Sequence, residues 1–424
     1  MFLGHSNTAF SMNEIISSAK PVSPSSQVRV HFLANGVFSD AVGGGNIYFT
    51  QMTRAVLGAG YHVHYFGGLA LRKFLRSVAL DVELTQLDEK EVGLTAATSF
   101  SQQVRLFSDL AKRTIKCVRR LREVQNRDLA FAISDYWFDT IPLMLCRARA
   151  KILYLGMICP TLGQIVFRTR PDVTANRLSS IYYWASQRFS LYCFRLCRNK
   201  IVTYGHPEMH DYLLGLGYQE SELRFVSNGM DAELAIRTPE QTKVYDVVWT
   251  GRVHPQKGID DLLNTLSYLA KRVADFQALI IGQAKAILEP KIKELGLANR
   301  VTFSGVVSEE EKFRLTKASR VFVMPSRYES WGIVIGEALA CAVPVVAYDL
   351  GPYRPVFGDF VRYAKCFDGG EFARMVEEQV RAMRGGKNYL HDLDLPGLIQ
   401  SLSWAQSRKQ FQQVLADADA KFQN

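Results

Sequence analysis

The chain has 424 residues, 48% of them hydrophobic, and a formal net charge of +10. This length and composition predict at least two globular domains with buried cores. The chain has no run of 18 apolar residues, so we expect no membrane-spanning helix. The seven cysteines lie at irregular spacings, and the only close pair, Cys193 and Cys197, has no histidine partners nearby in the sequence. This argues against a disulfide framework or a zinc site and indicates a reduced, cytosolic protein.

Short β-branched runs alternate with helical patterns along almost the whole chain. Residues 1–27 are polar, so we expect a disordered N-terminal arm and no signal peptide there. Apolar strands separated by helices are typical of parallel sheets, and their number is too high for one sheet, so we predict two doubly wound α/β domains. The predicted strands are Val28–Ala34, His62–Gly67, Val82–Leu87, Leu129–Ser134, Ile152–Leu155, Lys200–Tyr204, Leu223–Val226, Asp246–Thr250, Gln277–Ile281, Arg300–Ser304, Arg320–Met324 and Pro344–Ala347.

A glycine-rich turn follows the first predicted strand. Gly43, Gly44 and Gly45 open a predicted helix, where the backbone can approach a ligand and free N–H groups can face an anion. The turn is therefore a candidate anion-binding element. The alternative is a turn that only permits tight packing.

The positive charge is concentrated in one segment. Residues 101–200 carry 18 lysines and arginines against six acidic residues, so this segment alone exceeds the net charge of the whole chain. Its helical stretches mix these cations with tryptophan, tyrosine and phenylalanine, a pattern typical of association with an anionic membrane surface. The alternative is a solvated helix face. No nucleic-acid recognition module is evident, so we expect no nucleic-acid partner.

Two cations follow the strand predicted at residues 246–250. Gly251 ends this strand, Arg252 and Lys257 flank a short loop, and a helix is predicted to begin near Gly258. Cations at a strand end beside a helix N-terminus can bind a diphosphate, with arginine as a rigid fork and lysine as a point charge. The alternative is a pair of exposed loop cations.

Two acidic residues lie in an otherwise apolar stretch, 325–349. Glu329 precedes a helix predicted to begin near Gly332, where the N–H groups of residues 331–333 can face a phosphate. Glu337 lies about one and a half turns into that helix, where a carboxylate needs a partner. A pair of sugar hydroxyls, as in a ribose, is one such partner. The alternative is a structural cation, with Glu329 then acting as an electrostatic cap.

This stretch resembles the signature of family 4 of the retaining, nucleotide-sugar-dependent glycosyltransferases. The stretches "GRVHPQKGIDDLL", "VSNGMD" and "LSWAQSRKQFQQVL" are similar to further elements of that family. The matching positions of the main signature are Pro325, Ser326, Glu329, Trp331, Gly332, Glu337, Ala338, Ala340, Cys341, Pro344, Val345, Val346 and Ala347.

The resemblance implies a GT-B fold, in which two Rossmann-like domains face each other across a cleft. We expect an acceptor-side domain at residues 28–229, a donor-binding domain at 230–400, and a terminal helix at 401–424 that crosses back to the first domain. The implied catalytic residues are Arg252, Lys257 and Glu329. The implied donor-binding residues are Gly43, Gly44, Gly45, Gly251, Val306, Ser330, Trp331, Gly332, Ile333 and Glu337.

Two departures from the family pattern affect the site. The family's Gly-Gly-x-x-Glu element is replaced by "LGPYRP", which lacks one glycine and the acid. The family's N-terminal histidine is also absent from "ISDYWFD" and "YLGMICPT". Asp135 is the polar residue best placed after a strand there, so we assign it an acceptor or sugar contact, with helix capping as the alternative.

The implied activity is transfer of a hexose-type sugar, with retention, from a UDP- or GDP-sugar to a lipid-linked or cell-envelope glycan. No cofactor and no metal are expected, since the cations stabilise the leaving diphosphate. We expect a cytoplasmic protein that is peripheral at the inner membrane face. A catalytically weak nucleotide-sugar-binding subunit partnering another glycosyltransferase is the alternative.

Overall fold

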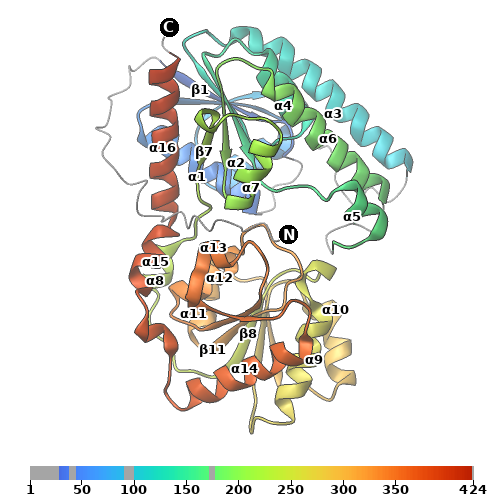
Figure 1. The fold of residues 1–424 in the computed structure, drawn as a ribbon, viewed down its shortest axis with the longest axis vertical. Helices are drawn as coiled ribbons and strands as arrows, with labels where there is room; N and C mark the ends of the chain where they lie inside the picture. The colour runs from blue at the N-terminus through green and yellow to red at the C-terminus, as the bar shows by residue number, and fades with distance from the viewer. Residues whose placement is uncertain (1–27, 38–43, 90–99, 171–176, 423–424) are drawn as a thin grey trace, which may run out of the picture.

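Two parallel sheets form the framework of the molecule (Figure 1). The computed structural model describes residues 28–37, 44–89, 100–170 and 177–422, so the predicted arm at 1–27 lies outside the described residues. The first sheet has the strand order β3-β2-β1-β4-β5-β6-β7, and the second β10-β9-β8-β11-β12-β13. Both are doubly wound arrangements whose order reverses beside the first strand, which confirms the predicted fold class.

The strands and helices alternate in both halves. The first sheet contains β1 (Arg29–Ala34), β2 (His62–Gly67), β3 (Glu83–Gln86), β4 (Leu129–Ala132), β5 (Ala150–Leu155), β6 (Lys200–Tyr204) and β7 (Leu223–Phe225). The helices around it are α1 (Gly44–Gly58), α2 (Leu69–Ser77), α3 (Phe100–Arg120), α4 (Trp137–Leu145), α5 (Leu162–Phe167), α6 (Arg177–Arg195) and α7 (Pro207–Gly215). The second sheet contains β8 (Tyr245–Thr250), β9 (Ala278–Ile281), β10 (Val301–Gly305), β11 (Ser319–Met324), β12 (Val345–Tyr348) and β13 (Val361–Ala364). The remaining helices are α8 (Ala232–Arg237), α9 (Ile259–Ala270), α10 (Lys285–Glu294), α11 (Glu309–Lys317), α12 (Ile333–Ala340), α13 (Arg354–Phe357), α14 (Gly369–Arg384), α15 (Leu395–Ser401) and α16 (Trp404–Lys421).

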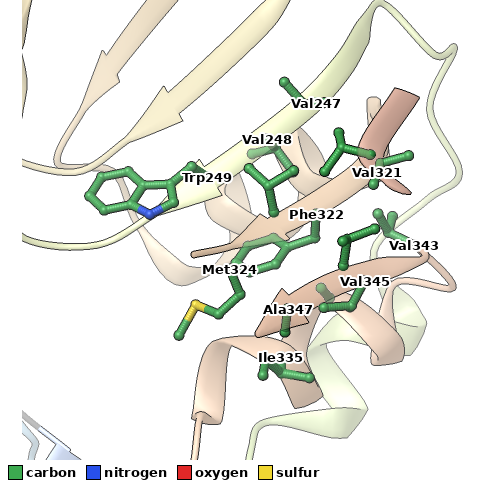
Figure 2. Packing of buried hydrophobic residues seen from close by; sticks show 14 of the residues in the cluster. Val247, Val248, Trp249, Val321, Phe322, Met324, Ile335, Val343, Val345 and Ala347 are labelled. Atoms are coloured by element: carbon green, nitrogen blue, oxygen red, sulfur yellow. The ribbon is translucent and has the colours of Figure 1, made fainter. Parts of the chain in front are cut away.

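The core of the second half is built from strands that are buried on both faces. Figure 2 shows Val248, Phe322 and Val345 from adjacent strands, with Ile335 of α12 packed beneath them. Such continuous apolar runs are what helices on both faces of a parallel sheet require. Strand β13 was not predicted, because it is an edge strand whose short run contains the exposed Arg362.

The C-terminal helix α16, drawn in red at the left of Figure 1, packs beside α1 of the first half. The Phe411 ring lies 5.1 Å from the Phe131 ring of β4, and Arg408 donates to Gln51 over 2.7 Å. The two segments that connect the halves meet where Met230 N–H donates to the Leu402 carbonyl. A Cβ on Gly229 would lie 2.7 Å from the Trp404 ring, so only glycine permits this close approach.

A buried chain of hydrogen bonds crosses three neighbouring strands of the first sheet. Asp128 lies 3.1 Å from His31 Nε2, the two Nδ1 atoms of His31 and His64 lie 3.2 Å apart, and His64 Nε2 lies 2.9 Å from Thr85 Oγ1. Two neutral rings satisfy all three contacts when Thr85 donates to His64 Nε2, His64 Nδ1–H donates to His31 Nδ1, and His31 Nε2–H donates to Asp128. Protonation of both rings would set the two Nδ1–H groups against each other.

We expect this cluster to make the fold sensitive to acid. Burial lowers the pKa of His64 from 6.5 to about 4. Between pH 6.5 and about 4, His64 is therefore protonated in the unfolded chain but not in the folded chain. The free energy of unfolding should therefore fall as the pH falls from about 6.5 to about 4. Thermal unfolding across this range checks it: His64→Asn should reduce the slope, whereas His62→Asn, at an exposed histidine on the same strand, should not. Equal slopes in wild type and His64→Asn would contradict the prediction.

Candidate functional site

The carboxyl ends of the two sheets face each other across the boundary between the halves (Figure 1). Arg170, which follows α5 in the first half, places its guanidinium 4.1 Å from the Tyr328 ring centre, beyond β11 in the second. His206, which follows β6, lies 3.0 Å from the Pro352 carbonyl oxygen beyond β12. Residues that follow strands in both domains therefore meet, and this is where doubly wound sheets bind ligands.

Glycines end three adjacent strands of the second sheet. A Cβ on Gly282, where φ is +117°, would lie 2.6 Å from the Gly251 carbonyl oxygen, and Gly282 N–H donates to the Gly305 carbonyl over 2.9 Å. The ends of β8, β9 and β10 therefore present half-buried backbone without side chains. Val306 follows Gly305 on β10, the edge strand, and is 78% exposed, two strands away from β8.

Two loops of the second domain pack tightly at this edge. Gly258, the residue before α9, has φ +62°, and a Cβ there would lie 1.8 Å from the Pro325 carbonyl oxygen. Arg327 N–H donates to the Gln256 carbonyl over 2.7 Å, and the Arg327 side chain pairs with Asp261 at 3.0 Å. The loop after β8 and the loop after β11 therefore form one rigid unit.

This unit brings together two predicted site residues that are 72 positions apart. Lys257 Nζ lies 2.5 Å from Glu329 Oε1, and both side chains are largely buried. Each charge supplies the partner that the other needs in a partly desolvated place. Arg252 is exposed on the same loop and pairs with no acidic side chain within the described ranges, so its guanidinium can receive an anion.

Glu337 is held by a protein cation. Lys312 of α11 lies 2.8 Å from Glu337 and 2.7 Å from Glu309. Burial raises the pKa of Glu337, an effect that Lys312 partly offsets. Lys312 is thus a structural cation of the kind named above as the alternative partner of Glu337, and the ribose contact stays a prediction.

The start of α12 adjoins Glu329. Gly332 adopts φ +88°, and α12 begins at Ile333 as predicted. Ser330 and Ile333 are half-buried at this turn. The Trp331 side chain is 2% exposed and packs against Phe357, so only the backbone of Trp331 is available to a ligand.

The first domain contributes a buried carboxyl group and a helix start. Asp135, beyond β4, is 4% exposed and accepts from Gln187 Nε2 over 2.5 Å; burial raises its pKa to about 7. Gln187 is fixed by the Met157 carbonyl and the Cys159 N–H. Gly44 begins α1 and Gly45 is exposed beside it, whereas Gly43 lies outside the described residues.

Several residues of the site were not predicted. Lys312 and Gln187 lie within helices, where no local pattern marks them as site residues, because their roles depend on tertiary packing. Two other residues could have been found from the sequence. His206 lies two positions after a predicted strand, and Arg170 ends the segment that follows another predicted strand.

Comparisons with known proteins agree with this geometry. Residues 232–380 match the model of a family described as "Glycosyl transferases group 1". Over 180 residues the chain is 32% identical to the mannosylfructose-phosphate synthase of Agrobacterium fabrum, which is 40% of this chain and 39% of that protein. Over 127 residues it is 33% identical to the D-inositol 3-phosphate glycosyltransferase of Mycobacteroides abscessus, 28% of this chain and 27% of that protein. The matches thus span well under half of these relatives.

Solved structures resemble almost the whole chain. The sucrose-phosphate synthase of Thermosynechococcus elongatus superposes with a TM-score of 0.67 at 17% identity, over 93% of this chain and 100% of that chain. HepE of Anabaena, solved in complex with UDP-glucose, gives 0.65 at 16% identity, over 92% and 99%. The chain therefore has the GT-B fold of glycosyltransferases, and its residues 232–380 match the glycosyl transferases group 1 family.

Proposed function

We propose that the chain is a retaining glycosyltransferase that moves a hexose-type sugar from a UDP- or GDP-sugar to a lipid-linked or cell-envelope glycan. The observation that carries the proposal is the Lys257–Glu329 pair, set among strand-ending glycines opposite the first domain. The group 1 match of residues 232–380 supports the reaction class, and the UDP-glucose bound to HepE supports a nucleotide-sugar donor.

The proposed chemistry follows from the charges at the edge of the second sheet. Negative charge develops on the leaving diphosphate, and preorganised cations stabilise it. Arg252 and Lys257 supply these cations, and the open backbone of Gly251 lets the diphosphate approach. Glu329 contacts the donor sugar. Glu337 binds the ribose while its carboxylate stays paired with Lys312.

No metal is needed in this scheme, so the transfer rate should not change when EDTA is added.

We place the acceptor against the first domain. Asp135 is a buried carboxyl group whose pKa of about 7 lets it hold or release a proton near neutral pH. Gln187 orients it, and in this proposal Asp135 contacts an acceptor or sugar hydroxyl.

The first domain also carries an exposed apolar surface. Val104, Phe107 and Ile115 of α3 are 51–52% exposed. The buried face of this helix is formed instead by Leu110, Arg113, Thr114 and Cys117. Leu178 and Phe189 of α6 are likewise exposed. Among the described residues, none of the helices is both long and apolar enough to cross a bilayer.

We propose that this surface and the surrounding cations bind anionic lipid. Vesicles with anionic lipid should retain the protein at low salt and release it at high salt, since the attraction is screened. Leu178→Ser should weaken binding severalfold, whereas Ile236→Ser should not; both side chains are 61% exposed, but Ile236 lies on the second domain. Equal binding to neutral and anionic vesicles would contradict the electrostatic part.

A thermal-shift panel of UDP, GDP, ADP and their common sugar derivatives tests the donor site. A ligand that binds only the folded state raises the melting temperature. We expect one nucleotide to stabilise wild type and to stabilise Glu337→Ala less. If no nucleotide stabilises the protein, the donor site is refuted. If one does but no sugar is transferred, the chain is a nucleotide-sugar-binding subunit.

A further inference from the structure

A histidine of the first domain reaches a loop of the second. His206 precedes α7 and is 1% exposed; its Nε2 lies 3.0 Å from the Pro352 carbonyl oxygen and its Nδ1 lies 3.2 Å from the Glu208 backbone N–H. Because Nδ1 must accept from that N–H, Nε2 carries the proton and donates to the Pro352 carbonyl. Burial lowers the pKa of His206, which keeps the ring in this neutral form.

The contact extends to the neighbouring residue of the loop. A Cβ on Gly351 would lie 2.4 Å from Glu208 Oε1, so the absence of a side chain lets the first turn of α7 approach. Two consecutive residues of this loop therefore rest on α7, in the stretch that departs from the family pattern.

The same loop forms part of the candidate donor site. Tyr353 follows Pro352, is fully buried, and its ring would lie 2.9 Å from a Cβ on Gly332 at the start of α12. Glu329 is near enough to raise the pKa of Tyr353, although burial is the larger cause. The Tyr353 hydroxyl has no hydrogen-bond partner among the described residues. A buried hydroxyl without a partner is costly unless a ligand completes it.

We propose that His206 is a positioning residue for the nucleotide-sugar donor: by holding the Pro352 carbonyl, it sets the loop that places Tyr353 against Gly332 and Glu329. This inference rests on the proposed function. It makes the donor site dependent on the first domain, since the loop that lines the site is fixed from across the domain boundary.

Two substitutions separate this role from helix capping. His206→Asn keeps an acceptor for the Glu208 N–H, because asparagine is a good N-cap residue, but is too short to reach Pro352. His206→Gln can still place an NH₂ group near the Pro352 carbonyl. His210→Asn is the control on the same helix, where the histidine pairs with Glu220 of the first domain at 2.9 Å.

The first readout is hydrogen exchange of the 349–357 backbone without donor. Exchange should be faster in His206→Asn than in wild type, His206→Gln and His210→Asn, while the melting temperature of His206→Asn stays that of wild type. The second readout is donor kinetics. The KM for the donor should rise about three- to tenfold in His206→Asn, as expected for one lost hydrogen bond, with kcat nearly unchanged and with recovery in His206→Gln.

Unchanged exchange in His206→Asn would overturn the inference, as would equal losses of kcat and melting temperature in both His206 variants, which indicate a structural role. If wild type binds no nucleotide, the proposed function fails, and with it the donor part of the inference. Exchange of the 349–357 backbone still decides whether His206 holds the loop, so the two failures are distinguishable.

Discussion

Lys257→Ala should lower the rate of sugar transfer by about 100- to 1000-fold, the loss typical of removing one preorganised group that stabilises developing charge. The substitution removes a cation from the proposed diphosphate site. It also leaves the largely buried carboxylate of Glu329 without its partner at 2.5 Å, so Glu329 would no longer be held in place for the donor. Steady-state kinetics with a fixed acceptor measure the effect on kcat/KM.

Lys271→Ala is the matched control for this prediction. Lys257 and Lys271 flank the same helix, α9, but Lys271 is exposed at the end away from the strand termini. We expect wild-type kinetics for Lys271→Ala. A Lys257→Ala enzyme within tenfold of wild type would show that this pair is not part of the catalytic site.

Gly258→Ala should destabilise the second domain by about 3 kcal/mol or more. Two causes add: a left-handed backbone costs a non-glycine residue about 1 kcal/mol, and the new Cβ would lie 1.8 Å from the Pro325 carbonyl oxygen, which is backbone of a packed loop. The loops after β8 and β11 would have to separate, and the Lys257–Glu329 pair lies between them. Thermal and urea unfolding measure the loss.

Gly296→Ala isolates the backbone cause. Gly296 has φ +71°, similar to the +62° of Gly258, but a Cβ there would meet no described atom within 4 Å. We therefore expect a loss of only about 1 kcal/mol for Gly296→Ala. Similar losses for the two variants would contradict the tight packing of the two loops.

The fold was predictable because parallel strands carry their signal locally. The runs at His62–Gly67 and Lys200–Tyr204 were predicted with the bounds that the structure shows, since each is rich in β-branched and aromatic residues and buried along most of its length. Strand β13 lacks this signal, because an edge strand with an exposed arginine reads as a polar segment.

The candidate site was predictable as single residues but not as pairs. Lys257 and Glu329 each stand out beside a strand end, yet nothing in the sequence shows that they meet across 72 positions. Glu337 was assigned a sugar partner, and the structure pairs it with Lys312 of α11, a contact that no local pattern in the sequence marks. His206 could have been noticed behind a predicted strand, but its contact with Pro352 depends on the packing of one domain against the other. Pairings of this kind are set by tertiary structure, and a local pattern does not contain them.

The most direct test of the account is sugar transfer by the purified full chain. The protein would be incubated with each common UDP- and GDP-sugar and with vesicles that contain lipid-linked glycans, and the release of nucleoside diphosphate and the product's anomeric configuration would be measured. We predict that one donor is consumed, that the configuration is retained, and that Lys257→Ala slows the release while Lys271→Ala does not. Binding of a nucleotide without consumption of any donor would contradict the proposed enzyme.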